Sequence, residues 1–168
     1  MKAITFKVLL KDLHELINAA RQDVALQVNS SLVLLYWRVG KRIHQDILQE
    51  KRAEYGEQIV SAVSRELTAE FGQGFSEKNL WHMIRFTEVF QDEEIVSALR
   101  RELSWTHLKQ IIYLDDPLKR DFYAEMCRIE RWSTRTLEKK IAGMLFGKKD
   151  KRVRPQHSPE HDPLCSGA

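Results

Sequence analysis

The chain has 168 residues, of which 43% are hydrophobic and 30% are charged, and its formal net charge is +3. This composition excludes a disordered chain, and the length suits one folded unit. Two cysteines cannot build a disulfide framework, and no apolar run resembles a signal peptide or approaches the roughly 18 residues of a membrane span. We therefore expect a cytoplasmic protein that has no membrane partner.

The first half of the chain has the apolar spacing of long helices. Apolar residues recur at helical intervals between residues 9 and 20, and a second series follows from 24 to 47. We predict one long helix or two, starting near Lys7 and ending near Gln49. A further stripe over residues 56–71 predicts a helix that ends at Gly72, because glycine commonly follows a last helical turn.

The second half has the pattern of short helices with identifiable starts. Ser76, Ser104 and Ser133 each precede an apolar-periodic run, where a serine hydroxyl caps a first turn, and Asp116 precedes a proline suited to the first helical position. The predicted helices cover residues 76–90, 93–102, 104–114, 116–131 and 133–146. No segment alternates as a strand does. We predict an all-α fold, a multi-helix bundle with helix-turn-helix-like elements over residues 1–147, followed by an unstructured tail over 148–168.

The predicted helix 76–90 is the first candidate for binding nucleic acid. It carries Lys78, Asn79, His82 and Arg85 beside apolar residues suited to a core. In a helix-turn-helix protein, the second helix presents short polar side chains to base edges and basic ones to phosphates. The basic residues would neutralise phosphates, and Asn79 would read a base edge. The alternative is the solvated face of an ordinary amphipathic helix, and the residues alone leave both open.

The predicted helix 133–146 and the basic block after it form the second candidate. Ser133 and Arg135 lie at a helix N-terminus, where free N–H groups favour an anion, and Lys139 and Lys140 follow. Residues 133–154 carry a net charge of +6, which suits a phosphate backbone. A capped helix followed by a solubilising tail is the alternative. The tail residues that we add to the predicted site are Lys148, Lys149, Lys151 and Arg152.

The residue pattern predicts neither a catalytic nor a metal site. Ser104 and His107 are neighbours in sequence, but no third group or oxyanion donor can be inferred for a nucleophilic site. His157, His161 and Cys165 recur every four residues, but they lie on a proline-broken segment without a fourth ligand. We therefore expect no cofactor, no metal and no enzyme activity.

Several short sequence blocks resemble the N-terminal domain of the YhcG-like bacterial proteins. They keep their order and spacing from about residue 12 to 146: Tyr55-Gly56, Ser64-Arg65-Glu66-Leu67, Phe71-Gly72-Gln73-Gly74-Phe75-Ser76, Asn79-Leu80, Arg85-Phe86, Leu103-Ser104-Trp105-Thr106-His107, Arg120-Asp121-Phe122-Tyr123 and Trp132-Ser133-Thr134-Arg135-Thr136-Leu137. Thr87 and Thr136 depart from the family pattern, which commonly has an aromatic and an acidic residue there. The resemblance implies a helical domain that recognises DNA or holds a complex together, ahead of a nuclease domain of the PD-(D/E)XK superfamily.

No position of this chain matches the nuclease motif of that superfamily, so the resemblance carries over no catalysis. The sequence ends where the nuclease domain would begin, as a shortened gene, a stand-alone paralogue or a cut fragment would. Our leading hypothesis is a non-catalytic DNA-binding module of a nuclease-associated bacterial system, with DNA favoured over RNA. The rival is a protein-interaction module that forms homo-oligomers or docks a separately encoded nuclease. Its support is the apolar run over residues 32–37, which a deep core explains equally well.

Overall fold

The computed structural model describes residues 2–50 and 53–144, with side chains over 7–47 and 54–144. These residues form seven α-helices and one short 3₁₀ helix and contain no strand, which confirms the all-α fold class. The tail predicted over residues 148–168 lies outside them. The elements are α1 (Lys2–Glu50), α2 (Ala53–Phe71), η1 (Gln73–Phe75), α3 (Glu77–Val89), α4 (Glu93–Glu102), α5 (Trp105–Ile111), α6 (Pro117–Glu130) and α7 (Thr134–Ala142).

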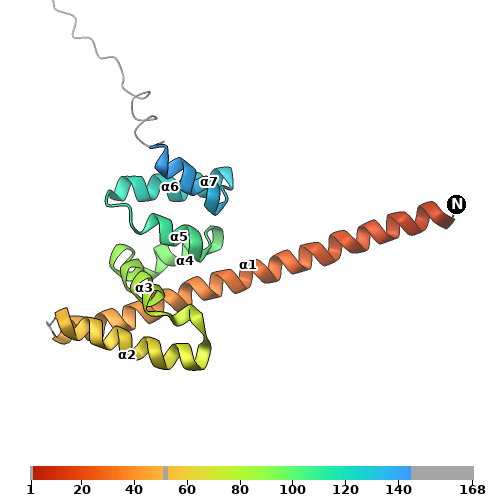
Figure 1. The fold of residues 1–168 in the computed structure, drawn as a ribbon. Coiled ribbons are helices and arrows are strands. Elements are labelled where there is room, and N and C mark those ends of the chain that lie inside the picture. The colour runs from red at the N-terminus through yellow and green to blue at the C-terminus, as the bar shows by residue number, and fades with distance from the viewer. Residues whose placement is uncertain (1, 51–52, 145–168) are drawn as a thin grey trace, which may run out of the picture.

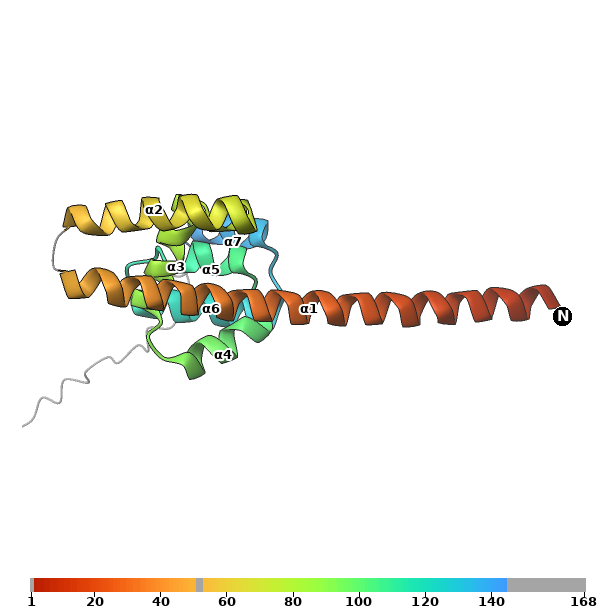
Figure 2. The same cartoon turned by 90° about the horizontal axis from the view of Figure 1, so that it is seen from below.

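The longest element, α1, is one continuous helix where the sequence left one helix or two open. Its residues 29–47, the packed half, lie against α3, α4 and α2. Its residues 7–28, the projecting half, extend away from the rest of the molecule (Figures 1 and 2). Every side chain of the projecting half is exposed. None of the described helices is both long enough and apolar enough to span a membrane.

The packed half of α1 and α3 cross in close contact because a glycine lies at the crossing. A Cβ atom at Gly40 would collide with the carbonyl oxygen of Met83 and would lie 2.8 Å from Oγ1 of Thr87. Beside this crossing, Trp37 is 1% exposed, and its indole N–H donates to the carbonyl oxygen of Phe90 at 2.7 Å. The crossing therefore depends on the absence of a side chain at Gly40 and on the large side chain of Trp37, which lies about one turn away on the same helix.

Aromatic rings form the centre of the core. Tyr36 packs edge-on against Phe75 and Trp105, with ring centroids 6.0 and 5.0 Å apart. Trp105 in turn contacts Phe86 at 5.6 Å. Tyr36 belongs to the apolar run over residues 32–37, whose buried members lie in this core. The core therefore accounts for most of the run that supported the rival hypothesis.

Three of the predicted helix starts are confirmed in atomic detail. The Ser104 hydroxyl accepts from the backbone N–H of His107, whose ring accepts from the Ser104 N–H in return, so α5 begins with a capping box. The Ser133 hydroxyl accepts from the N–H of Thr136 at 3.2 Å and caps α7. Asp116 caps α6 ahead of a proline at the first helical position.

The connection between α2 and α3 contains one confirmed prediction and one correction. Gly72 ends α2 with a φ of 91°, a conformation that glycine adopts without steric cost, and its N–H donates to the carbonyl of Thr68. The Ser76 side chain, by contrast, makes no capping hydrogen bond to α3. The prediction of a serine cap there was wrong, because the backbone has cap geometry while the hydroxyl does not accept a bond from the first turn.

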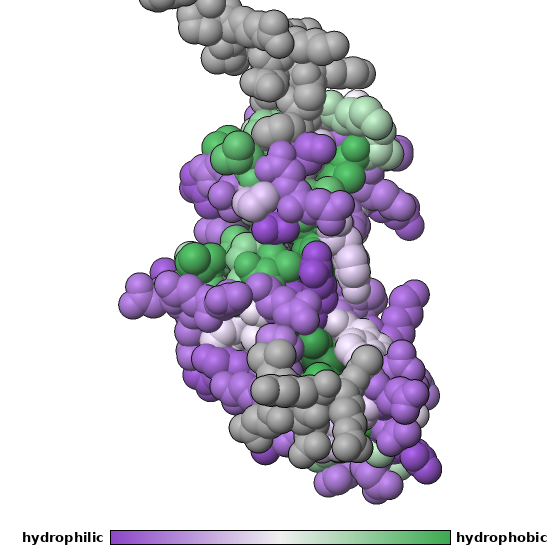
Figure 3. Space-filling model, turned by 90° about the vertical axis from the view of Figure 1, so that its left-hand side faces the viewer, coloured by the Kyte–Doolittle hydropathy of each residue, from purple (hydrophilic) through white to green (hydrophobic). Residues whose placement is uncertain are grey.

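The last three helices are joined by hydrogen bonds that connect side chains to the main chain. Nε2 of His107 donates to the carbonyl of Trp132 at 2.8 Å, and the Tyr123 hydroxyl donates to the carbonyl of Lys140 at 3.3 Å. Cys127 is buried among them, and burial raises the pKa of its thiol to about 11. The face of the molecule opposite the projecting half is mostly hydrophilic, with small separate apolar patches (Figure 3).

Candidate nucleic-acid interface

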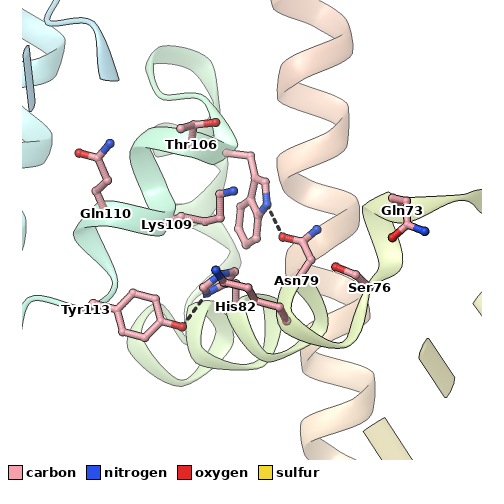
Figure 4. Close-up of a pocket in the computed structure, with 10 residues that line it drawn as sticks. Gln73, Ser76, Asn79, His82, Thr106, Lys109, Gln110 and Tyr113 are labelled. Carbon is pink, nitrogen blue, oxygen red and sulfur yellow. Dashed lines mark hydrogen bonds between the residues drawn. The ribbon is translucent and has the colours of Figure 1, made fainter. Parts of the chain in front are cut away.

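A hollow of about 580 Å³ opens between α3 and α5, with η1 at one end. Figure 4 shows the side chains of these elements arranged around it. We call it the α3–α5 hollow. None of the described residues that line it is acidic: they are Gln73, Ser76, Lys78, Asn79, His82, Trp105, Thr106, Lys109, Gln110 and Tyr113.

The charged side chains that line the hollow are two lysines, Lys78 and Lys109, and both lie near His82. The pKa of His82 lies below its usual value, because the ring is partly removed from water and because Lys109 and Lys78 lie nearby. Two cations that make a third group harder to protonate create a field that favours an anion. The hollow on α4 differs, since it is lined by Glu93, Glu94 and one arginine.

An aromatic ring is held at the edge of the hollow by its contact with His82. Nδ1 of His82 and the hydroxyl of Tyr113 are 2.6 Å apart, and the two rings pack edge to face at 5.4 Å (Figure 4). Tyr113 is nevertheless 51% exposed. Partial burial raises the pKa of its hydroxyl, with Arg85 acting against this change and Glu88 adding to it. The arrangement presents an oriented aromatic face beside the lysines.

Asn79, predicted to read a base edge, has both ends of its amide engaged within the protein. Its Oδ1 accepts from the indole N–H of Trp105 at 3.0 Å, as Figure 4 shows, and its Nδ2 donates to the carbonyl of Gly74. The side chain thereby joins α3 to α5 and to η1. In this structure Asn79 shapes the hollow, since each end of its amide makes one hydrogen bond within the protein.

Arg85 lies on α3 beyond the residues that line the hollow. Its guanidinium is 3.6 Å from the carboxylate of Glu88, which also lies 3.5 Å from the ring of His44. The side chain is 39% exposed and acts on the nearby Tyr113. Arg85 thus borders the positive region with part of its charge offset by Glu88.

A smaller hollow of about 390 Å³ lies between α5 and α7 and shares Lys109, Gln110 and Tyr113 with the first. The two hollows therefore adjoin. On α7 the smaller one is lined by Glu138, Ile141 and Ala142, so this end of the surface carries an acidic side chain. Nε2 of Gln110 donates to the carbonyl of Thr134 at 3.1 Å and ties α5 to the start of α7.

The cations predicted on α7 lie outside both sets of lining residues. Ser133 is consumed as the helix cap, Arg135 and Lys139 are exposed, and Lys140 lies with Nζ 5.5 Å from the centroid of the Trp132 ring. The structure thus gathers Lys78, Asn79 and His82 at one hollow and leaves Arg85 at its border. Lys148, Lys149, Lys151 and Arg152 lie outside the described residues.

Sequence reasoning missed the contribution of α5. Thr106, Lys109, Gln110 and Tyr113 line the hollow, yet none of them was among the predicted site residues. The signal was present, because these positions follow each other at intervals of three and four and so share the helix face opposite the buried leucine and isoleucines.

The pair Ser104 and His107 serves as a cap and not as a nucleophilic site. Both ring nitrogens of His107 are occupied, Nδ1 by Ser104 and Nε2 by the carbonyl of Trp132. Within residues 2–50 and 53–144, no three histidine, cysteine or carboxylate side chains are grouped for metal binding. The histidines and cysteine of the tail, His157, His161 and Cys165, lie outside the described part of the chain.

Comparison with known proteins bears out the resemblance seen in the sequence blocks. The chain is 27% identical over 164 residues to the Escherichia coli (strain K12) protein named "Putative nuclease YhcG", in a match that covers 78% of this chain and 43% of that protein. It therefore spans less than half the length of this curated relative, and no solved structure matches it. The family described as "DUF1016 N-terminal domain" matches residues 12–148. Since this match covers most of the sequence, the chain belongs to the family of the DUF1016 N-terminal domain.

Proposed function

We propose that the chain binds nucleic acid, DNA in preference to RNA, through the α3–α5 hollow. The observation that carries the proposal is a lining that includes Lys78, Lys109 and His82 and no acidic residue among those described. Phosphate oxygens are bound by cations and by N–H or O–H donors, and the hollow offers both. Tyr113 adds an exposed ring on which a base or sugar stacks. In the helix-turn-helix interpretation, α3 is the helix that approaches the groove.

Gln110 replaces Asn79 in this proposal as the residue that contacts a base. Its Nε2 is bonded to Thr134, whereas its Oε1 is buried without a hydrogen-bond partner among the described residues. A buried acceptor without a partner destabilises the fold, so a turn of the Gln110 amide that brings its oxygen to the hollow, where a base amino group can pair with it, is favoured. Replacing Gln110 by Met should weaken binding without changing its salt dependence, because no charge is removed.

We further propose that the chain is the recognition part of a nuclease system and is not catalytic by itself. The support is the name of the Escherichia coli relative and a match that covers 43% of that protein. The same facts suit a module that docks a separately encoded nuclease, which is the alternative function. In that case the hollow would contact protein, and the purified chain would have no affinity for a DNA duplex.

The test is a salt titration of binding to a short labelled duplex, followed by fluorescence anisotropy. Between about 50 and 200 mM salt the logarithm of the association constant should fall linearly with the logarithm of salt concentration. The double variant Lys78→Ala/Lys109→Ala should reduce that slope by about 2, since each lysine neutralises about one phosphate. The charge-matched control is Arg65→Ala/Arg101→Ala, whose arginines are exposed and do not line the hollow.

The outcomes separate three possibilities. Absence of binding by the unaltered chain at about 50 mM salt rejects the proposal. Equal losses in the hollow variant and its charge-matched control show that net charge alone drives binding. A third variant, Arg135→Ala/Lys139→Ala/Lys140→Ala, locates the site on α7 if it alone abolishes binding with an unchanged melting temperature.

A further inference from the structure

Apolar side chains of the projecting half gather on one side of α1. Successive residues of an α-helix are turned by about 100° around its axis. This rotation places six apolar residues of the projecting half within a sector of about 80°. The large members of this set are between 41% and 61% exposed. We call it the α1 stripe, and it consists of Leu10, Leu13, Ile17, Ala20, Val24 and Val28.

The α1 stripe lies on the opposite side of the helix from the body of the molecule. In the packed half, the buried residues Val33, Tyr36 and Gly40 lie roughly 180° from the stripe by the same rotation. Leu35, which continues the stripe, is 45% exposed although Tyr36 beside it is buried and Leu34 is partly buried. A second helix laid along the stripe would therefore meet no obstruction from α2–α7.

The spacing of the stripe is that of a coiled-coil seam. Leu10, Ile17 and Val24 recur every seven residues, and Leu13 and Ala20 alternate with them at intervals of three and four. β-Branched residues at the first of these positions, here Ile17 and Val24, combined with leucine at the second, here Leu13, favour two parallel strands. Leu10 and Ala20 depart from that rule. These five positions cover about two heptads, and the next two seam positions hold Gln27 and Ser31. We propose that two copies of this chain pair through their α1 stripes as a parallel two-stranded coiled coil.

The charges beside the stripe favour the parallel orientation. One flank carries Lys7, His14 and Arg21, and the other carries Leu9, Leu16 and Asp23. In a parallel pair each flank faces the opposite flank of the partner helix, whereas in an antiparallel pair each faces its own copy. The antiparallel arrangement would bring the flank that carries Lys7 and Arg21 against its own copy, and these cations would repel each other.

The experiment is the molar mass of the full chain by size-exclusion chromatography with light scattering, without nucleic acid. One chain has a mass of 19.8 kDa, and the proposal predicts twice this value. The variant Leu13→Asp/Ile17→Asp should elute as one chain. The matched control Val8→Asp/Leu26→Asp should keep the doubled mass, because those residues are 53% and 56% exposed on the side away from the stripe. Far-UV circular dichroism checks that both variants remain helical.

Orientation is tested by a disulfide cross-link. In a parallel pair the two copies of position 13 face each other within reach of a disulfide, so Leu13→Cys combined with Cys165→Ser should cross-link under mild oxidation. Leu26→Cys in the same background should not, and Cys127 stays in place because it is buried. A single-chain mass for the unaltered protein, a doubled mass for the stripe variant, or a mass above two chains overturns the pairing. Absence of the cross-link overturns the parallel orientation. Neither result depends on binding to nucleic acid.

Discussion

The two halves of α1 share one helix and a similar content of apolar residues, yet their surroundings are opposite. Trp37 in the packed half is 1% exposed, whereas Ile17 in the projecting half is 51% exposed. The packed half is fixed by Gly40 at the crossing with α3 and by side-chain bonds to α3 and α4. The projecting half has its own backbone bonds, an exposed ion pair between Lys11 and Glu15 and an apolar stripe. Helical periodicity thus establishes a helix and its apolar face, while other elements decide whether that face is covered.

The largest expected difference between the halves is in the cost of removing a large apolar side chain. Trp37→Ala should lower the free energy of unfolding by about 3–5 kcal/mol, because it empties a core site and leaves the Phe90 carbonyl without its donor. Leu26→Ala, at a projecting position that is 56% exposed, should change it by less than about 0.5 kcal/mol. Urea denaturation followed by circular dichroism measures both. Similar costs would show that the projecting half is covered on the side of Leu26.

A smaller effect is expected where the packed half approaches α3 most closely. Gly40→Ala should destabilise the chain by about 1–3 kcal/mol, because the added methyl group meets the backbone of Met83. Gly56→Ala is the control, since its Cβ would meet only the side chain of Ile47, at 3.3 Å. That substitution should be close to neutral. The prediction fails if both variants unfold at the same denaturant concentration.

The boundary between the halves can be located with two asparagines. Nδ2 of Asn29 donates to the carbonyl of Leu103 at 3.2 Å, so Asn29→Ala should cost about 1 kcal/mol of stability. Asn18→Ala, on the exposed projecting half, should cost less than about 0.5 kcal/mol. Thermal unfolding of the two variants side by side provides the measurement. An equal or larger loss at residue 18 would move the boundary toward the N-terminus.

The smallest effect concerns His82 on α3, the helix that the packed half covers. Its pKa is lowered in the folded chain, first by desolvation and then by Lys109 and Lys78, so the unfolded chain takes up the proton more readily. The neutral ring therefore contributes fully to the stability of the fold above pH 6.5, the usual pKa of histidine, and this contribution is lost as the pH falls below that value. His82→Gln should reduce the loss of stability between about pH 7 and pH 5. A nuclear magnetic resonance titration of Lys78→Ala/Lys109→Ala should show the His82 pKa moving up, and an unchanged value would contradict the assigned cause.

The helix boundaries could be predicted because they depend on residues close together in the sequence. Ser104, Ser133 and Asp116 cap the helices that follow them, and Gly72 ends the one before it. The same reasoning wrongly predicted a serine cap at Ser76, since residue type does not reveal which way a hydroxyl points. The projection of residues 7–28 could not be predicted either, because an apolar stripe has the same spacing whether or not another element covers it.

The candidate site was predicted only on one of its two sides. The side chains of α3 were identified because one helix carries them, whereas Lys109 and Tyr113 come to His82 through tertiary contact across about thirty residues. The assignment of Asn79 to a base depended on its polarity, and the sequence did not show that Trp105 and Gly74 use both ends of its amide. The role of these residues in binding nucleic acid stays a prediction.

The length of α1 has a mechanical consequence. A helix of 49 residues is about 74 Å long, and the part before residue 29 reaches roughly 40 Å beyond the body. Because helical backbone bonds make it stiff, α1 is a spacer of fixed reach and differs from a flexible tether, whose ends explore many separations. Whatever is joined near residue 7 is held at a set distance from the α3–α5 hollow and cannot fold back onto it without breaking the helix.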